Sequence, residues 1–142
     1  MLDVFVVLLQ IFLWIWLGWV VVNLSIFVAG ALLVRPSGPI FNGFVVYVPD
    51  SIISQLTKRE LAAVVMHEHG HRAHLHVWKN LGRRCLLLPF TTGMRMQQEL
   101  EADDYVTDAA ALASALRKIH HHPFDLRRAM RLEARHDGSV RG

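Results

Sequence analysis

The feature that most limits how this chain can fold is an unbroken apolar stretch at its N-terminus. Residues 2–34 carry one charged side chain, Asp3, whereas all 15 Lys and Arg residues lie at Arg35 or later. About 20 apolar residues are enough to cross a bilayer as a helix. A buried core helix of this length would need more covering chain than residues 35–142 provide. The stretch is therefore predicted to be a transmembrane helix.

We expect a membrane anchor at residues 1–34 and a folded domain at residues 35–142, with a flexible tail from about residue 135. A cleaved signal peptide is the alternative, because a weak Ala-x-Ala site lies at Ala29–Ala31. Against it, no basic residue precedes the apolar run, and the run exceeds the length of a signal sequence. Arg35 at the end of the run predicts a cytosolic domain by the positive-inside bias, as in a single-pass protein of the bacterial inner membrane.

The charge pattern indicates which kinds of partner the domain can bind. The domain is mildly basic, which favours contact with an anionic bilayer surface. Its basic residues are scattered and are not interleaved with aromatic ones, so no nucleic-acid-binding surface is predicted. The single cysteine, Cys85, excludes an internal disulfide and fits a reducing compartment. A core thiol is a better interpretation of Cys85 than a nucleophile.

The domain is predicted to be mostly α-helical with a small β element, either an edge strand or a hairpin. Arg35–Gly43 is rich in proline and glycine and separates the anchor from the domain. Phe44–Val48 is a β-rich run that predicts a strand, and Ser51–Leu56 predicts a turn or short helix. Cys85–Phe90 is apolar but too short to span a membrane, so we expect a buried connector or a patch that dips into the bilayer interface.

Three helices are predicted in the domain. Thr57, with Glu60 three residues later, forms a capping box that starts the first helix. Pro123 suits the first position of the third helix, with His122 as its cap. The helices are expected at approximately residues 58–78, 93–119 and 123–134.

Within the first predicted helix, HEHGH at residues 67–71 has the spacing of a metal site. His67 and His71 share one helix face, about 5–6 Å apart at Cβ, so both imidazoles can reach one zinc ion at about 2.0–2.1 Å. Glu68 projects beside the metal and can accept a proton from a metal-activated water. The pattern alone fixes only three positions, so on this pattern a zinc site and a chance match are equally supported. Its place in mid-helix after an apolar run favours the metal site.

A catalytic zinc usually has three protein ligands and one open position. Glu99, on the second predicted helix, can supply the third ligand. Asp103 shares its face and can accept the free ring N–H of His67 or His71, whereas Glu101 should point elsewhere. A solvated acidic face is the alternative interpretation of these carboxylates, and the HExxH pattern upstream favours the metal site.

The other histidines of this stretch are expected to be bystanders. His69 should face away from the metal. His74 lies on the ligand face but does not complete a longer zinc motif, so it is a weak candidate ligand. His76 is expected either next to a ligand or at the surface.

Three motifs occur in order: HEHGH, then ELEADDYVTDAAALASALRKI, then HHPFDLRRAM. Together they resemble the HtpX-type and CAAX-prenyl-protease-type membrane zinc metallopeptidases, which are gluzincins, over about Gly38 to Leu132. The resemblance implies a compact zincin-like domain that binds one zinc ion per chain through His67, His71 and Glu99.

The resemblance also implies individual roles. Glu68 would act as general base and then general acid, and Asp103 as the partner of a ligand histidine. His122 and Arg128 would donate to the tetrahedral oxyanion; a helix cap for His122 and a surface position for Arg128 stay equally open. In such peptidases an edge strand lies above the active helix at the place of Phe44–Val48, where an extended substrate can pair by strand addition.

The larger relatives have membrane spans between the two halves of the site, whereas residues 72–98 separate His71 from Glu99 here without a span. A closed intramembrane chamber and prenylated substrates are therefore not implied. We expect a membrane-anchored zinc endopeptidase whose protein or peptide substrates are associated with the membrane or misfolded. The alternatives are a non-catalytic zinc-binding membrane protein with a regulatory contact, and a histidine-rich metal buffer.

Overall fold

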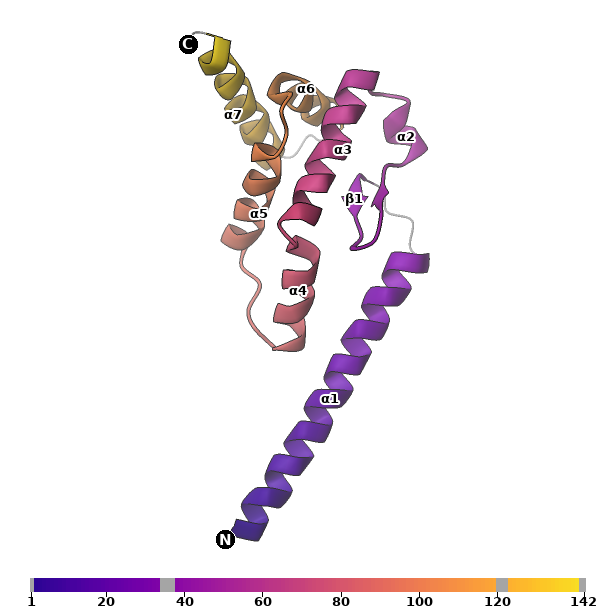
Figure 1. The fold of residues 1–142 in the computed structure, drawn as a ribbon, viewed down its shortest axis with the longest axis vertical. Helices are drawn as coiled ribbons and strands as arrows, with labels where there is room; N and C mark the ends of the chain where they lie inside the picture. The colour runs from indigo at the N-terminus through magenta and orange to yellow at the C-terminus, as the bar shows by residue number, and fades with distance from the viewer. Residues whose placement is uncertain (1, 34–37, 120–122, 141–142) are drawn as a thin grey trace. The chain divides into compact units, whose positions relative to one another are not determined.

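The computed structural model describes residues 2–33, 38–119 and 123–140 (Figure 1). These residues form two compact units: the N-terminal helix groups with Trp78–Phe90, and the other described residues form the second unit. The N-terminal helix α1 covers Leu2–Leu33 and is long and apolar enough to cross a membrane. Its large apolar side chains are mostly exposed.

The second unit begins with a β-hairpin. Strand β1 (Ile40–Phe41) pairs with strand β2 (Val46–Tyr47) in an antiparallel register that sets Ile40 opposite Tyr47. The prediction of a small β element is therefore confirmed, and the hairpin is the form that it takes.

The hairpin turn explains why β2 is shorter than the predicted strand at Phe44–Val48. Asn42 Oδ1 accepts the backbone N–H groups of Phe44 and Val45 at 3.1 and 3.0 Å, which commits those two residues to the turn. Gly43 has a φ of 98°, a conformation that residues with a Cβ rarely adopt. Strand β1 comes from the segment that was expected to be only a spacer.

Six helices follow in the described residues: α2 (Asp50–Ile53), α3 (Lys58–Ala73), α4 (His76–Cys85), α5 (Thr92–Asp104), α6 (Ala109–Ile119) and α7 (Pro123–Val140). The predicted capping box at the start of α3 is present, with the Thr57 and Glu60 side chains each accepting from the other's backbone. The first predicted helix is wrong in its length, because it breaks at Leu75, which has a left-handed φ of 56°. The second breaks between α5 and α6.

Two further findings concern the chain's later part: one of the two interpretations of the connector after α4 is excluded, and the predicted end of α7 is wrong. The connector after α4 is not buried, since Leu86, Leu87 and Leu88 are all exposed. Contact of this segment with the bilayer interface stays a prediction. Helix α7 continues beyond its predicted end at residue 134, where Arg135 donates hydrogen bonds to the carbonyls of Asp103 and Val106.

The apolar core of the second unit is built from α3, α6 and α7. Most of its members are alanines, whose small side chains let helices pack closely. Helix α3 also contacts α5 and the hairpin, so its polar residues on those sides lie inside the unit. The core residues are Ala63, Val64, Val106, Ala109, Ala111, Leu112, Ala113, Ala115, Leu116, Ala129 and Leu132.

Candidate metal centre

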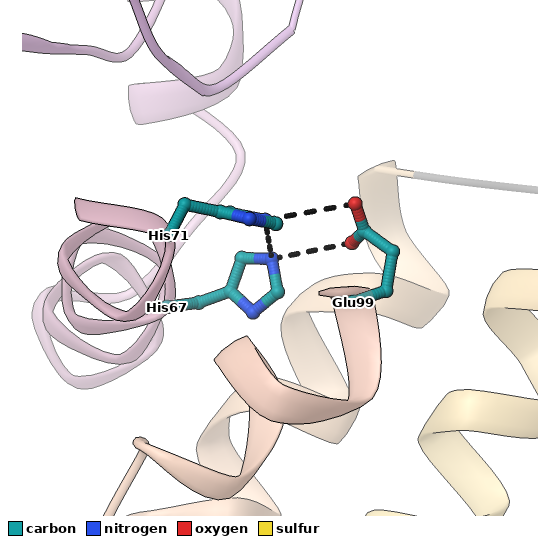
Figure 2. Close-up of side chains that lie close together, drawn as sticks. All are labelled: His67, His71 and Glu99. Carbon is teal, nitrogen blue, oxygen red and sulfur yellow. Dashed lines mark hydrogen bonds and ion pairs between the residues drawn. The ribbon is translucent and has the colours of Figure 1, made fainter. Parts of the chain in front are cut away.

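Three donor side chains converge where α3 faces α5 (Figure 2). His67 and His71 lie one turn apart on α3, and Glu99 lies on α5. The Nε2 atoms of His67 and His71 are 3.2 Å apart. The Glu99 carboxylate oxygens lie 3.4 Å from Nε2 of His67 and 3.6 Å from Nε2 of His71. The structure thus brings together the three residues that were predicted as ligands.

The spacing of these donors fits a zinc ion. Ligand atoms bound at about 2.0–2.1 Å to a tetrahedral zinc lie about 3.3 Å from one another. The three observed separations, 3.2, 3.4 and 3.6 Å, lie close to that value. Two imidazoles and one carboxylate are also a ligand set of catalytic zinc sites. The residues present therefore fit a zinc ion with little rearrangement.

Burial and pairing set the ionisation of the donors. Burial lowers the pKa of His71 to about 4. Burial would raise the pKa of Glu99, but the hydrogen bond with His67 and the charge of Arg128 outweigh it and lower that pKa to about 2. Burial would lower the pKa of His67, but its carboxylate partners raise it above the ordinary value. At neutral pH the site therefore holds an ionised Glu99, a neutral His71 and a proton on His67 that a metal would replace.

Asp103 lies behind His67, on the far side of the ring from the donor cluster. Its Oδ1 is 3.0 Å from Nδ1 of His67, and its side chain is 1% exposed. The contact is short, but its geometry is not that of a hydrogen bond, and Nδ1 has no hydrogen-bond partner among the described residues. Asp103 was predicted to contact the ring of either His67 or His71, and the structure places it at His67.

Arg128 of α7 joins the two carboxylates of the site. Its guanidinium donates to both oxygens of Asp103, with Nε–Oδ2 at 2.9 Å and Nη2–Oδ1 at 2.7 Å. Its Nη1 lies 2.8 Å from Glu99 Oε2. With 5% of the residue exposed, a surface position for Arg128 is excluded. This planar fork fixes the geometry of both carboxylates at once.

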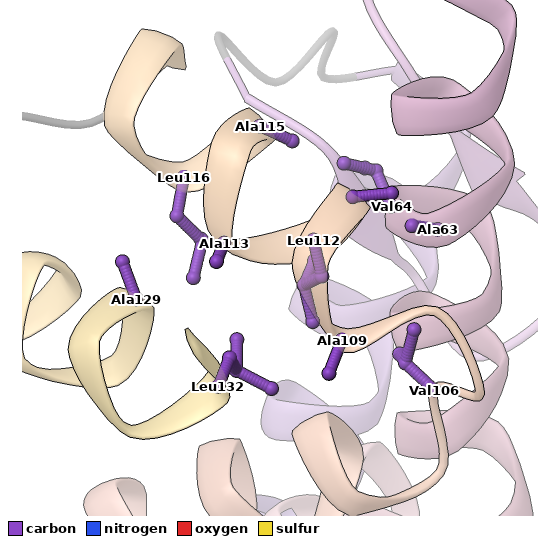
Figure 3. Close-up of a cluster of buried hydrophobic side chains, with 11 residues drawn as sticks. Ala63, Val64, Val106, Ala109, Leu112, Ala113, Ala115, Leu116, Ala129 and Leu132 are labelled. Carbon is purple, nitrogen blue, oxygen red and sulfur yellow. The ribbon is translucent and has the colours of Figure 1, made fainter. Parts of the chain in front are cut away.

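The core holds Arg128 in this position. Ala129 and Leu132, which follow it on α7, are almost fully buried against α6 (Figure 3). Helix α7 therefore cannot shift without opening the core. The apolar packing of α6 and α7 is thus what places a guanidinium between Glu99 and Asp103.

Glu68 is buried beside the donors and is held by the hairpin. Its Oε2 accepts the backbone N–H of Phe41 in β1 at 2.7 Å, and the residue is 6% exposed. Burial raises the pKa of its carboxyl, against the opposing charge of His67 and the hydrogen bond from Phe41. Phe41 was not singled out in the sequence, because a backbone donor leaves no side-chain signal.

Gly70 explains how α3 and α5 approach closely enough to share a metal. A Cβ on Gly70 would lie 2.9 Å from both Cα and O of Ala102 and 3.0 Å from Cβ of Tyr105. A larger residue would push α5 away from α3, and Glu99 with it. This variable position of the HExxH pattern therefore has a packing requirement in this chain.

His71 has an outer partner, His76, that lies five residues later. The two Nδ1 atoms are 2.8 Å apart, and Nε2 of His76 lies 2.9 Å from Oε2 of Glu101. His76 is 2% exposed, so of its two predicted positions the one next to a ligand is correct. On an unbroken helix, residues five apart do not share a face. The break at Leu75 brings the rings together, and no motif in the sequence indicates that break.

The remaining predicted residues take different places. His69 is exposed. Glu101 points away from the donor cluster, as expected, and toward His76. His74 is not part of the donor cluster; its ring stacks on His76, with centroids 5.4 Å apart. His122 lies outside the described residues.

Comparison with known proteins gives one match. No curated protein and no solved structure matches the chain. The family model of Peptidase family M48 matches residues 37–134. That span includes the hairpin, α3, α5 and the Arg128 turn of α7, and it covers more than half of the chain. The chain therefore belongs to peptidase family M48, a family of zinc metallopeptidases.

Proposed function

We propose that the chain is a membrane-anchored zinc endopeptidase that hydrolyses peptide bonds. The observation that carries the proposal is the spacing of the His67, His71 and Glu99 donors, with Glu68 adjacent on α3. Three protein ligands leave one coordination position open for chemistry. The M48 family supports the same class of reaction.

Glu68 performs the proton transfers in this proposal. A zinc ion at the site would polarise the scissile carbonyl and make water more acidic. The Glu68 carboxylate accepts one proton from water as the water oxygen bonds to the carbonyl carbon. It then gives that proton to the leaving nitrogen as the C–N bond breaks. The hydrogen bond from Phe41 to Glu68 fixes the orientation of the carboxylate during both transfers.

Residues that contact the proposed ligands fix the orientation of those ligands. Asp103 orients the ring of His67. Arg128 positions Glu99 and Asp103, because its nitrogens contact both carboxylates. Direct donation to the oxyanion by Arg128 and His122, which the family resemblance implies, is a further part of the proposal.

The proposed substrate is an extended protein or peptide segment near the membrane surface. Helix α1 supports the anchoring, since it has the length and apolar character of a span. The position of Arg35 at the end of the apolar run supports a cytosolic domain by the positive-inside bias. The β-hairpin contacts α3 and binds Glu68 through its first strand. An extended substrate that adds to this hairpin would therefore lie next to the proton-transfer group.

The test compares the zinc-loaded full chain in detergent with its Glu68→Gln variant. A glutamine can still accept the Phe41 N–H, so the fold and the bound zinc are expected to persist. It cannot take up a proton, so the cleavage of a casein-like unfolded protein should fall by at least about 10²-fold. Equal rates in the two proteins at equal zinc content would contradict the peptidase. That result would favour a non-catalytic zinc-binding membrane protein.

A further inference from the structure

A second group of metal-binding side chains lies next to the donor cluster. His74, His76 and Glu101 each offer one donor atom, and these atoms lie within 4.8 Å of one another. We propose that these three residues form a second, weaker zinc site, and that its occupation weakens metal binding by His67 and His71.

The chemistry of the group suits a transition metal. Two imidazoles with one carboxylate favour zinc, copper or nickel over magnesium and calcium. His76 Nε2 and Glu101 Oε2 are 2.9 Å apart, slightly closer than the roughly 3.3 Å that a tetrahedral zinc sets between its ligands. His74 must turn out of its stack on His76 to direct a nitrogen at the same ion. His74 is the partly exposed C-cap of α3 and has room for that rotation.

The required rotation is the reason why the second site should be the weaker one. The donors of His67, His71 and Glu99 already have the spacing of a zinc site. The donors of the second group must first be reoriented, and this reorganisation reduces the binding free energy.

The backbone conformation between His74 and His76 supports the proposal that these two histidines bind a metal together. On a continuous helix, residues two apart point to opposite sides. Leu75 has a φ of 56°, a left-handed conformation that is unfavourable for a residue with a Cβ. This turn brings the rings of His74 and His76 together. Strain of this kind is concentrated at sites where a particular geometry is needed.

His76 couples the two groups. Its Nδ1 lies 2.8 Å from Nδ1 of His71, and a contact this short holds one proton between the two nitrogens. When His71 binds a metal through Nε2, the proton is on its Nδ1, and His76 accepts it. When His76 binds a second metal through Nε2, its own Nδ1 carries a proton, and two N–H groups face each other. Filling both sites therefore removes a favourable hydrogen bond. This coupling, unlike the second site itself, rests on the proposed ligand role of His71.

The test counts bound metal and does not depend on activity. The full chain in detergent is dialysed to equilibrium against increasing zinc, as wild type, His74→Ala and His69→Ala. His69 is the matched control, an exposed histidine of the same helix that belongs to neither group. We expect two zinc ions per chain in wild type and in His69→Ala, and the loss of only the weaker one in His74→Ala. One zinc ion in wild type, or two in His74→Ala, would overturn the second site.

The coupling has its own measurement. The exchange of tightly bound radioactive zinc against unlabelled zinc should become about tenfold faster as the weaker site fills in wild type, because His71 loses its outer partner. In His74→Ala the exchange rate should not depend on this filling. Equal behaviour of the two proteins would overturn the coupling. Neither result depends on whether the zinc-loaded chain cleaves a substrate, so failure of the peptidase proposal remains separately visible.

Discussion

Helix α3 carries two buried glutamates in opposite environments. Glu60, near its start, is surrounded by donors: Thr57 N at 2.7 Å, Ser114 Oγ at 2.6 Å and the Lys118 ammonium at 2.7 Å. The hydrogen bond from Lys118, followed by those from Ser114 and Thr57, lowers the pKa of Glu60 to about 2. We call the part of α3 around Glu60 its structural end.

Glu68 lies two turns further along, in the part of α3 that we call its metal end. One backbone N–H, that of Phe41, binds its carboxylate, and burial raises its pKa. A buried carboxylate with many donors contributes to stability and gives up its acceptor capacity. A buried carboxylate with few donors takes up a proton more readily, which suits proton transfer. The contrast between Glu60 and Glu68 supports the proposed role of Glu68, because the two buried carboxylates differ in their hydrogen-bond partners.

The largest effect is expected from removing a donor at the metal end. Glu99→Ala should lose tight zinc binding by more than the roughly 10–100-fold that the loss of an outer partner costs. Equilibrium dialysis measures this loss of zinc affinity, with Glu133→Ala as the control. In the part of the chain that the structure describes, the only ion-pair partner of Glu133 is the exposed Arg117. Wild-type zinc affinity in Glu99→Ala would mean that the metal end is held by other residues.

The contact that brings α5 to the metal end can be tested at Gly70. Gly70→Ala should reduce the free energy of unfolding by about 1–3 kcal/mol through overpacking against Ala102, and it should weaken zinc binding as Glu99 moves away. Gly93→Ala is the matched control, because no atom of the described residues lies within 4 Å of its added Cβ. Its expected effect is neutral or stabilising by about 0.4–1 kcal/mol. Denaturant unfolding followed by circular dichroism distinguishes the two, and similar values for both variants would contradict the close approach.

The structural end should respond in stability and not in metal binding. Glu60→Gln loses charge-assisted hydrogen bonds, so its free energy of unfolding should fall by about 1–2 kcal/mol. A fully buried network would lose more; here Lys118 is partly exposed, and solvent weakens its interaction with Glu60. Zinc affinity measured by dialysis should stay at the wild-type value. A loss of zinc without a loss of stability would reverse the assignment of the two ends.

The same glutamate is expected to affect the pH dependence of stability. Glu60 titrates near 4.5 when unfolded and at about 2 when folded, so its stabilisation is complete above pH 4.5 and declines as the pH falls toward 2. Wild type should therefore lose more unfolding free energy than Glu60→Gln over that interval. Thermal unfolding at several pH values measures the difference, and parallel curves would contradict it.

Much of the site was predictable because it follows helix periodicity. The i to i+4 spacing of His67 with His71, and of Glu99 with Asp103, places each pair on one helix face, and the structure turns these faces toward each other. The capping box at Thr57 was predictable for a similar reason, since its chemistry lies within four residues.

The features of the site that the sequence did not predict depend on tertiary contacts. The break at Leu75 contains neither glycine nor proline, so nothing in the local sequence separates α3 from α4. Without that break the position of His76 against His71 cannot be deduced. The hydrogen bond from Phe41 to Glu68 uses a backbone N–H, which every residue except proline has. The two-residue strand that carries it is too short for a β pattern to show.

The most direct test of the contrast between the two ends is the rate of peptide cleavage per bound zinc ion in Glu60→Gln and Glu68→Gln, measured side by side below the unfolding temperature of both. Glu60→Gln should keep the wild-type rate despite its lower stability. Glu68→Gln should lose at least about 10²-fold with its zinc still bound. Equal rates in the two variants would contradict the assignment of proton transfer to the metal end of α3.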